Sequence, residues 1–219
     1  MNNHGLLIFD LDGTLFRADT VTIPAVQRSF QEHGLPLPSP EKICSFFGKP
    51  VADFNAWMRS QCPQESADEL INAVTRRELE LISETGALYP HVREILTTLR
   101  ASVGQMAICT NGPQDYVERV VTVHGLKPFF DAIRHRKFTK DSKPRMVREL
   151  LGRLPSRPAI VIGDRHDDVQ AAHENGIYAI AATYGFGATH ELASADAAAS
   201  SPADLPALVR SLLTDQAQI

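Results

Sequence analysis

The chain has 219 residues, of which 43% are hydrophobic and 22% are charged, the composition of an ordinary globular protein. Its formal net charge of -4 argues against a nucleic-acid-binding protein held by a basic face. No uncharged stretch approaches the roughly 20 residues that span a bilayer, and the first residues lack the basic start of a signal peptide. We therefore expect a cytoplasmic protein with neither nucleic-acid nor membrane partners. The three cysteines form no CxxC pair, which makes a disulfide framework or a zinc site unexpected.

The first predicted element is a strand over Leu6–Phe9, an apolar run typical of a strand buried on both faces. Residues 17–86 then carry helical patterns at 26–33, 52–59 and 67–83, interrupted by prolines and without a convincing strand. From residue 87 onward, helices are predicted at 92–99, 116–123, 146–154 and 204–213, and strands at 106–109, 159–162 and 178–181, with weaker strands at 132–136 and 195–199. Strands that alternate with helices indicate an α/β fold with a mainly parallel sheet. We expect an α/β core domain of residues 1–16 and 87–219, and an inserted α-helical cap domain of residues 17–86.

Polar side chains stand where the predicted strands end, which is where open α/β sheets bind ligands. They are Asp10 and Asp12 after the first strand, Thr110 and Asn111 after the second, Asp164 and Asp168 after the strand at 159–162, and Lys143 just before the helix at 146–154. Each alone has an ordinary explanation as a turn former, a helix cap or a solvated side chain. Together, the carboxylates would repel one another unless they hold a divalent cation, and oxygen ligands without a His or Cys pair favour Mg²⁺. A hydroxyl and a lysine suit the oxygens of a phosphoryl group.

Four segments resemble, in order and spacing, the motifs of the haloacid dehalogenase (HAD) superfamily: Asp10-Leu11-Asp12-Gly13-Thr14-Leu15, Thr110-Asn111-Gly112, Lys143-Pro144, and Gly163-Asp164 with Asp168. The helical insertion between the first two motifs is that of the C1 cap type. The resemblance implies a Rossmann-like doubly wound parallel sheet with an inserted cap. Dehalogenases of the superfamily lack the second aspartate of motif one, so Asp12 favours phosphoryl transfer. Arg165 stands where Ser or Thr is common, and we give it no catalytic role.

The resemblance also implies a role for each motif residue in a phosphatase that uses Mg²⁺ and an aspartyl-phosphate intermediate. Asp10 is the nucleophile, and Asp12 protonates the leaving group and then activates water. The metal is held by the Asp10 side chain, the Asp12 backbone carbonyl and Asp164, with Asp168 ligating through water or bracing the site. The substrate phosphate is bound by Thr110, the Asn111 amide and Lys143.

Residues 33–50 and 183–192 resemble phosphoglycolate phosphatases and their relatives, which implies a small phosphorylated metabolite as substrate. Lys49, in a Gly48-Lys49-Pro50 turn, is a candidate substrate-binding residue, or else a solvated lysine; Arg17 is a weaker candidate. The aromatic residues of the cap are expected to pack its own small core: Phe46, Phe47, Phe54 and Trp57.

Three other enzyme functions stay open, and two non-enzymatic functions are disfavoured. A phosphomutase of the β-phosphoglucomutase type, a nucleotidase or a pyrophosphatase shares the motifs. A signalling receiver domain is about half this length and has no cap, and a catalytically idle binding protein is disfavoured by the intact motifs. Both a monomer and a homodimer are compatible with the sequence.

Overall fold

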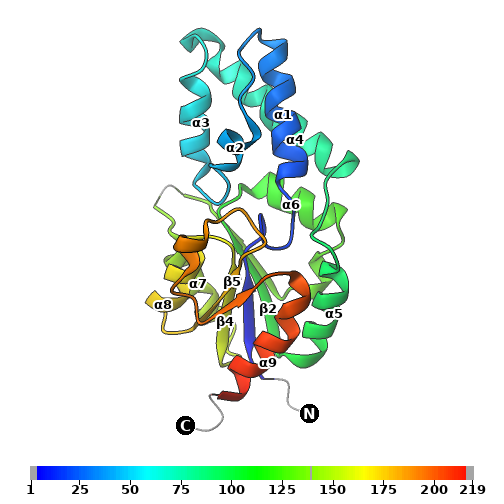
Figure 1. The fold of residues 1–219 in the computed structure, drawn as a ribbon, viewed down its shortest axis with the longest axis vertical. Coiled ribbons are helices and arrows are strands. Elements are labelled where there is room, and N and C mark those ends of the chain that lie inside the picture. The colour runs from blue at the N-terminus through cyan, green and yellow to red at the C-terminus, as the bar shows by residue number, and fades with distance from the viewer. Residues whose placement is uncertain (1–3, 139, 216–219) are drawn as a thin grey trace.

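A six-stranded parallel sheet forms the centre of the computed structural model, which describes residues 4–138 and 140–215 (Figure 1). The strands are β1 (Leu6–Phe9), β2 (Gln105–Thr110), β3 (Ala132–His135), β4 (Ala159–Gly163), β5 (Tyr178–Ala182) and β6 (Ala197–Ala199). Their order, β3-β2-β1-β4-β5-β6, is that of a doubly wound Rossmann-like sheet. All the predicted strands are confirmed, including the two weaker ones at β3 and β6.

The central strand explains the apolar run at the start of the chain. β1 pairs with β2 on one side and with β4 on the other, so both of its edges are hydrogen-bonded. Leu7 and Phe9 belong to the hydrophobic cluster on one face of the sheet, and Leu6 and Ile8 to the cluster on the other face. Because each face is covered, this strand has no solvent-facing side chain.

Helices cover both faces of the sheet (Figure 1). On one face lie α5 (Val92–Ser102), α6 (Gln114–Val123) and α9 (Leu205–Asp215), whose apolar residues join the first cluster. On the other lie α7 (Lys143–Arg153) and α8 (His166–Glu174). Short 3₁₀ turns complete the chain at Gln64–Ser66, Lys127–Phe129, Thr189–Leu192 and Pro202–Asp204.

Four further helices lie beyond the carboxyl ends of the strands, opposite both termini (Figure 1). They are α1 (Asp19–Glu32), α2 (Pro40–Cys44), α3 (Val51–Arg59) and α4 (Ala67–Glu84), and α1 packs along α4. No strand occurs between residues 17 and 86, all of which are described. The division into a cap of residues 17–86 and a core of residues 1–16 and 87–219 stays a prediction.

Some boundaries differ from those predicted. α1 begins at Asp19 rather than at residue 26 and contains Pro24. α2 and α8 are short helices that the sequence pattern did not predict, and α8 begins at His166. The three cysteines are unpaired. None of the helices in the described ranges has the length and apolar character that crossing a bilayer requires.

Candidate active site

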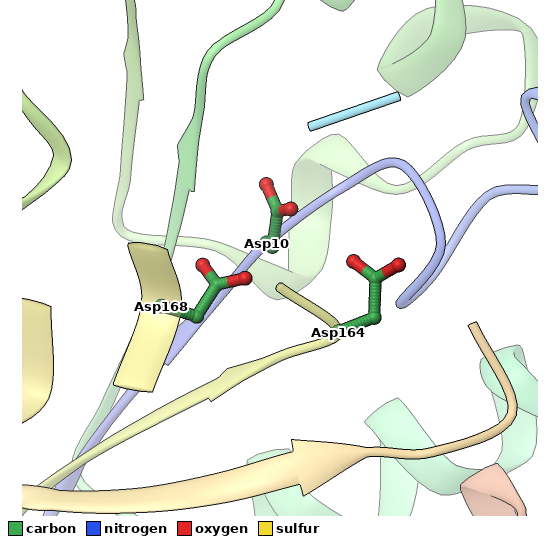
Figure 2. Close-up of side chains that lie close together, drawn as sticks. All are labelled: Asp10, Asp164 and Asp168. Carbon is green, nitrogen blue, oxygen red and sulfur yellow. The ribbon is translucent and has the colours of Figure 1, made fainter. Parts of the chain in front are cut away.

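Three buried carboxylates meet at the carboxyl edge of the sheet (Figure 2). Asp10 directly follows β1, Asp164 directly follows the neighbouring strand β4, and Asp168 lies in the first turn of α8. Their exposed fractions are 2%, 0% and 1%, and one oxygen from each lies within 4.8 Å of the others. The sheet thus brings together three groups that are up to 158 positions apart, by the difference between residues 10 and 168. Such a cluster is strongly repulsive when all its members are ionised.

A single ammonium group offsets part of this charge. The Nζ of Lys143 lies 2.9 Å from Oδ1 of Asp10 and 2.6 Å from Oδ1 of Asp168, and the Lys143 side chain is 1% exposed. Burial lowers the pKa of Lys143, but the two carboxylates outweigh it, so its pKa is raised and the amine stays charged. Lys143 is the first residue of α7, not a residue before the helix as we expected. The first turn of α7 therefore holds the backbone of Lys143 in place, from which its side chain extends to the carboxylates.

Asp164 is the carboxylate with the least compensation. Its Oδ2 accepts a hydrogen bond from the backbone N–H of Phe186 at 2.7 Å, whereas its buried Oδ1 has no hydrogen-bond or ion-pair partner among the described residues. Burial, followed by the charges of Asp10 and Asp168, raises its pKa well above the ordinary value. An unpartnered buried carboxylate oxygen is costly unless a cation binds it.

Asp168 is engaged through both oxygens. Oδ1 faces Lys143, and Oδ2 accepts the backbone N–H of Arg165 at 3.0 Å, which caps α8. Burial raises its pKa to about 7, against the lowering effect of Lys143. These contacts support the bracing role among the two roles that the sequence left open for Asp168.

The second aspartate of the first motif has a different environment. Asp12 is half-buried, and its Oδ1 accepts a hydrogen bond from the Tyr116 hydroxyl at 2.8 Å. Burial, then the charge of Asp10, raises its pKa to about 7, while the tyrosine bond lowers it. Asp10 lies beside the ammonium, whereas Asp12 has no ion-pair partner among the described residues. Tyr116 was not predicted as a site residue, because a tyrosine on a helix carries no local signal for its partner.

The end of β2 supplies a hydroxyl and an amide. Thr110 accepts the backbone N–H of Gly112 through Oγ1 at 3.1 Å, which leaves its own hydroxyl hydrogen free to donate. Asn111 donates from Nδ2 to the carbonyl of Gly48 at 2.7 Å, and its Oδ1 accepts from Arg136. With its side chain so engaged, the backbone N–H is the part of Asn111 suited to bind an anion. Arg136 is a further neighbour that the sequence did not indicate.

A pocket opens between this sheet edge and the helices α1–α4. Asp10, Asp12, Thr110 and Asn111 line it, and so does Lys49. Of the predicted substrate-binding residues, Lys143 is not part of this lining, and neither are Asp164 and Asp168. The ammonium of Lys49 lies 5.6 Å from the centre of the Phe46 ring. The remaining lining from the helical side is mainly apolar and includes Phe46, Phe47, Val51, Phe54 and Leu79.

Other expected residues lie outside the pocket lining or pack differently. Arg17 pairs with Asp19 at 2.7 Å and is absent from the lining. Arg165, to which we gave no catalytic role, pairs with Glu191 at 3.3 Å.

The cap aromatics are only partly as expected. Trp57 packs against Phe30, Phe46 and Phe54, which confirms a small aromatic core. Phe47 also reaches beyond these helices: its ring contacts Phe186, which follows β5, at a centroid distance of 4.6 Å.

Comparisons with known proteins agree with this geometry. Residues 7–182 match the family model described as haloacid dehalogenase-like hydrolase. A phosphoglycolate phosphatase of Pasteurella multocida is 28% identical over 198 residues, which cover 85% of this chain and 88% of that protein. A haloacid dehalogenase-like family hydrolase from Streptococcus pneumoniae superposes with a TM-score of 0.81 at 25% identity, over 95% of this chain and 100% of that chain. The crystal structure of a predicted phosphoglycolate phosphatase from Haemophilus somnus shares the fold with a TM-score of 0.85 at 22% identity, over 95% of this chain and 99% of that chain.

Proposed function

The chain belongs to the haloacid dehalogenase-like hydrolase family, and on that premise we propose that it is a phosphatase that hydrolyses a small phosphomonoester through an aspartyl-phosphate on Asp10. The observation that carries the proposal is the contrast between two aspartates two residues apart. A carboxylate oxygen of Asp10 lies 2.9 Å from the buried Lys143 ammonium, at the end of the central strand, where it can be presented to a phosphate as a nucleophile. Asp12 lines the same pocket with a raised pKa, which favours a proton donor near neutral pH.

In the first step, a carboxylate oxygen of Asp10 attacks phosphorus, and the bond from phosphorus to the ester oxygen breaks. Asp12 gives its proton to the departing alkoxide, so the alcohol leaves neutral. In the second step, the Asp12 carboxylate takes a proton from water, whose oxygen attacks the same phosphorus and frees the Asp10 carboxylate. Thr110, the backbone N–H of Asn111 and Lys143 hold the phosphate oxygens during both steps, which is mostly positioning and electrostatic stabilisation.

The acidic cluster fits a hard divalent cation, for which we propose Mg²⁺. The unpartnered Oδ1 of Asp164 and the three converging carboxylates form an oxygen donor set of the kind Mg²⁺ prefers. Asp10, Asp164 and the backbone carbonyl of Asp12 would hold the ion, and Asp168 would brace them. A bound Mg²⁺ supplies positive charge that offsets the repulsion between Asp10 and a phosphate.

Thermal unfolding tests the metal site without relying on activity. At 100 times its dissociation constant, a ligand of the native state stabilises by about 2.7 kcal/mol, which is roughly 5–11 °C in the unfolding midpoint of a chain this long. Asp164→Asn should abolish that shift. Asp167→Asn, a half-buried neighbour outside the cluster, should keep it. A full shift in the Asp164 variant would contradict the assignment.

The catalytic proposal is tested by phosphate release. A panel of phosphoglycolate, sugar phosphates, a nucleotide, pyrophosphate and p-nitrophenyl phosphate should show Mg²⁺-dependent release, and Asp10→Asn should lose it while staying folded. A mutase would transfer phosphate between positions of a sugar without releasing it, and a nucleotidase or pyrophosphatase would show in the corresponding arm. Retained turnover in a pure, folded Asp10→Asn protein would sink the nucleophile assignment. The cytoplasmic location and the choice between monomer and homodimer stay predictions, the second open to light scattering.

A further inference from the structure

The wall of the pocket opposite the reacting aspartates holds an additional carboxyl group, that of Glu78 on α4. It lines the same pocket as Asp10, Asp12 and Thr110. The Thr22 hydroxyl on α1 donates to Oε1 of Glu78 at 2.5 Å. No other hydrogen bond and no ion pair involves Glu78 among the described residues, so its Oε2 stays available. No motif in the sequence indicates a role for Glu78.

No positively charged side chain pairs with the Glu78 carboxyl group among the described residues. Burial is the main influence on its pKa and raises it to about 7, and the hydrogen bond from Thr22 opposes that rise. Among the described residues Glu78 has this hydrogen bond and no ion pair, which is unusual for a carboxyl group in a partly apolar wall. A group of this kind is satisfied when a ligand brings a hydrogen-bond donor.

The charge balance of the pocket points the same way. Among its lining residues, Lys49 is the one cationic side chain, it is exposed, and it lies over the Phe46 ring. Apart from Asp10 and Asp12, the lining also contains the carboxyl groups of Glu78 and Asp115. A second anionic group on the substrate would therefore face two acids and one solvated lysine.

We propose that Glu78 is a specificity-determining residue, which accepts a hydrogen bond from a hydroxyl or amine on the alcohol part of the substrate and disfavours a carboxylate there. This inference rests on the proposed phosphatase function and narrows its substrate class. Thr22 fixes Oε1, so Oε2 is the oxygen that meets the ligand. A hydroxyl and an amine share the donor chemistry, and the experiment separates them.

Four two-carbon phosphomonoesters that differ only in the terminal group make the test: 2-hydroxyethyl phosphate, phosphoethanolamine, ethyl phosphate and phosphoglycolate. The wild-type protein should turn over at least one of the donor-bearing esters with kcat/KM about 10- to 100-fold above ethyl phosphate and phosphoglycolate, the range of a hydrogen bond to a charged group. Whichever of the hydroxyl and amine esters is faster identifies the donor. Wild-type preference for phosphoglycolate would overturn the proposal.

Substitution separates recognition from bracing of α1 against α4. Glu78→Gln keeps an oxygen for the Thr22 hydroxyl and keeps the shape, but it removes the negative charge. It should lower the preference for the donor-bearing ester over phosphoglycolate about tenfold or more. Glu80→Gln, on the exposed face of the same helix, should leave that ratio unchanged.

A purely structural role predicts equal losses for all four esters in Glu78→Gln, and that result would refute recognition. Thr22→Val provides a second variant, in which the carboxyl group remains but loses its fixed orientation; the ratio should fall there as well. Phosphate release from none of the esters, nor from p-nitrophenyl phosphate, would instead contradict the proposed function itself. The two failures are therefore distinguishable.

Discussion

Replacing Tyr116 by phenylalanine should move the pH dependence of catalysis to higher pH. The Tyr116 hydroxyl donates to Oδ1 of Asp12 at 2.8 Å, and this bond stabilises the ionised carboxylate and lowers its pKa. The phenol remains a donor over the working pH range, because burial, and then the charge of Asp12, raise its own pKa well above the ordinary value. Without the hydroxyl, Asp12 should hold its proton to higher pH.

The size of the change follows from the energy of the bond. A hydrogen bond to a charged group contributes about 1.5–3 kcal/mol, and one pKa unit corresponds to about 1.36 kcal/mol, which gives roughly 1–2 units. Asp12 is half-buried, so water replaces part of the lost bond, and we expect a rise of about 1 unit. The Phe16 contact, at a centroid distance of 6.3 Å, involves only the ring and is retained.

The assay is kcat/KM against pH with two substrates. With an alkyl phosphate, whose leaving group needs a proton, the alkaline limb should move up by about 1 unit from its wild-type position. With p-nitrophenyl phosphate, whose leaving group needs none, the limb should not follow Asp12. Tyr184→Phe is the matched control, since the Tyr184 hydroxyl donates to the backbone carbonyl of Thr14 and not to Asp12. An unmoved limb, a shift to lower pH, or equal shifts for both substrates would refute the reasoning.

Lys143→Met leaves the buried carboxylates without their cation and should abolish turnover. It should also lower the free energy of unfolding by about 3–5 kcal/mol, which lowers the metal-free unfolding midpoint by roughly 6–20 °C. The raised pKa of Lys143 means that its stabilisation is fully present at pH 8, below the unfolded value, so an unchanged midpoint there contradicts the pairing. Asp141→Asn should lower the free energy of unfolding by about 1.5–3 kcal/mol at pH 6. Hydrogen bonds lower the pKa of Asp141 to about 2, so the wild-type protein loses this stabilisation as pH falls from 4 to 2. In acid unfolding, the difference in stability between variant and wild type should shrink over that range. Gly13→Ala should reduce kcat at least tenfold, since φ is +83° and a Cβ would lie 2.1 Å from Oδ2 of Asp164. Gly34→Ala, at φ +65° with open space, bears only the backbone cost of about 1–3 kcal/mol and should keep activity.

The sequence by itself determined the scaffold and its reactive edge. An apolar run with no alternation, such as Leu6–Phe9, predicts a strand covered on both faces, and its partners β2 and β4 do bury it. The carboxylates and the lysine were predicted because they follow strands or precede a helix, and parallel strands deliver their carboxyl ends to one edge. Two helices were not predicted. α2 has five residues, too few for a helical period to be recognised, and α8 has no large apolar side chain other than Val169 to mark a buried face.

Only the tertiary structure decided which side chains meet across the pocket. Tyr116 reaches Asp12 over 104 positions, and Thr22 reaches Glu78 over 56. No periodicity or motif encodes such pairs, because they arise from how α6 docks on the sheet and how α1 packs along α4. The local pattern of the chain thus predicts the chemistry of phosphoryl transfer. The packing of the helices over the sheet edge decides the hydrogen-bond partner of Asp12 and the chemical character of the pocket wall.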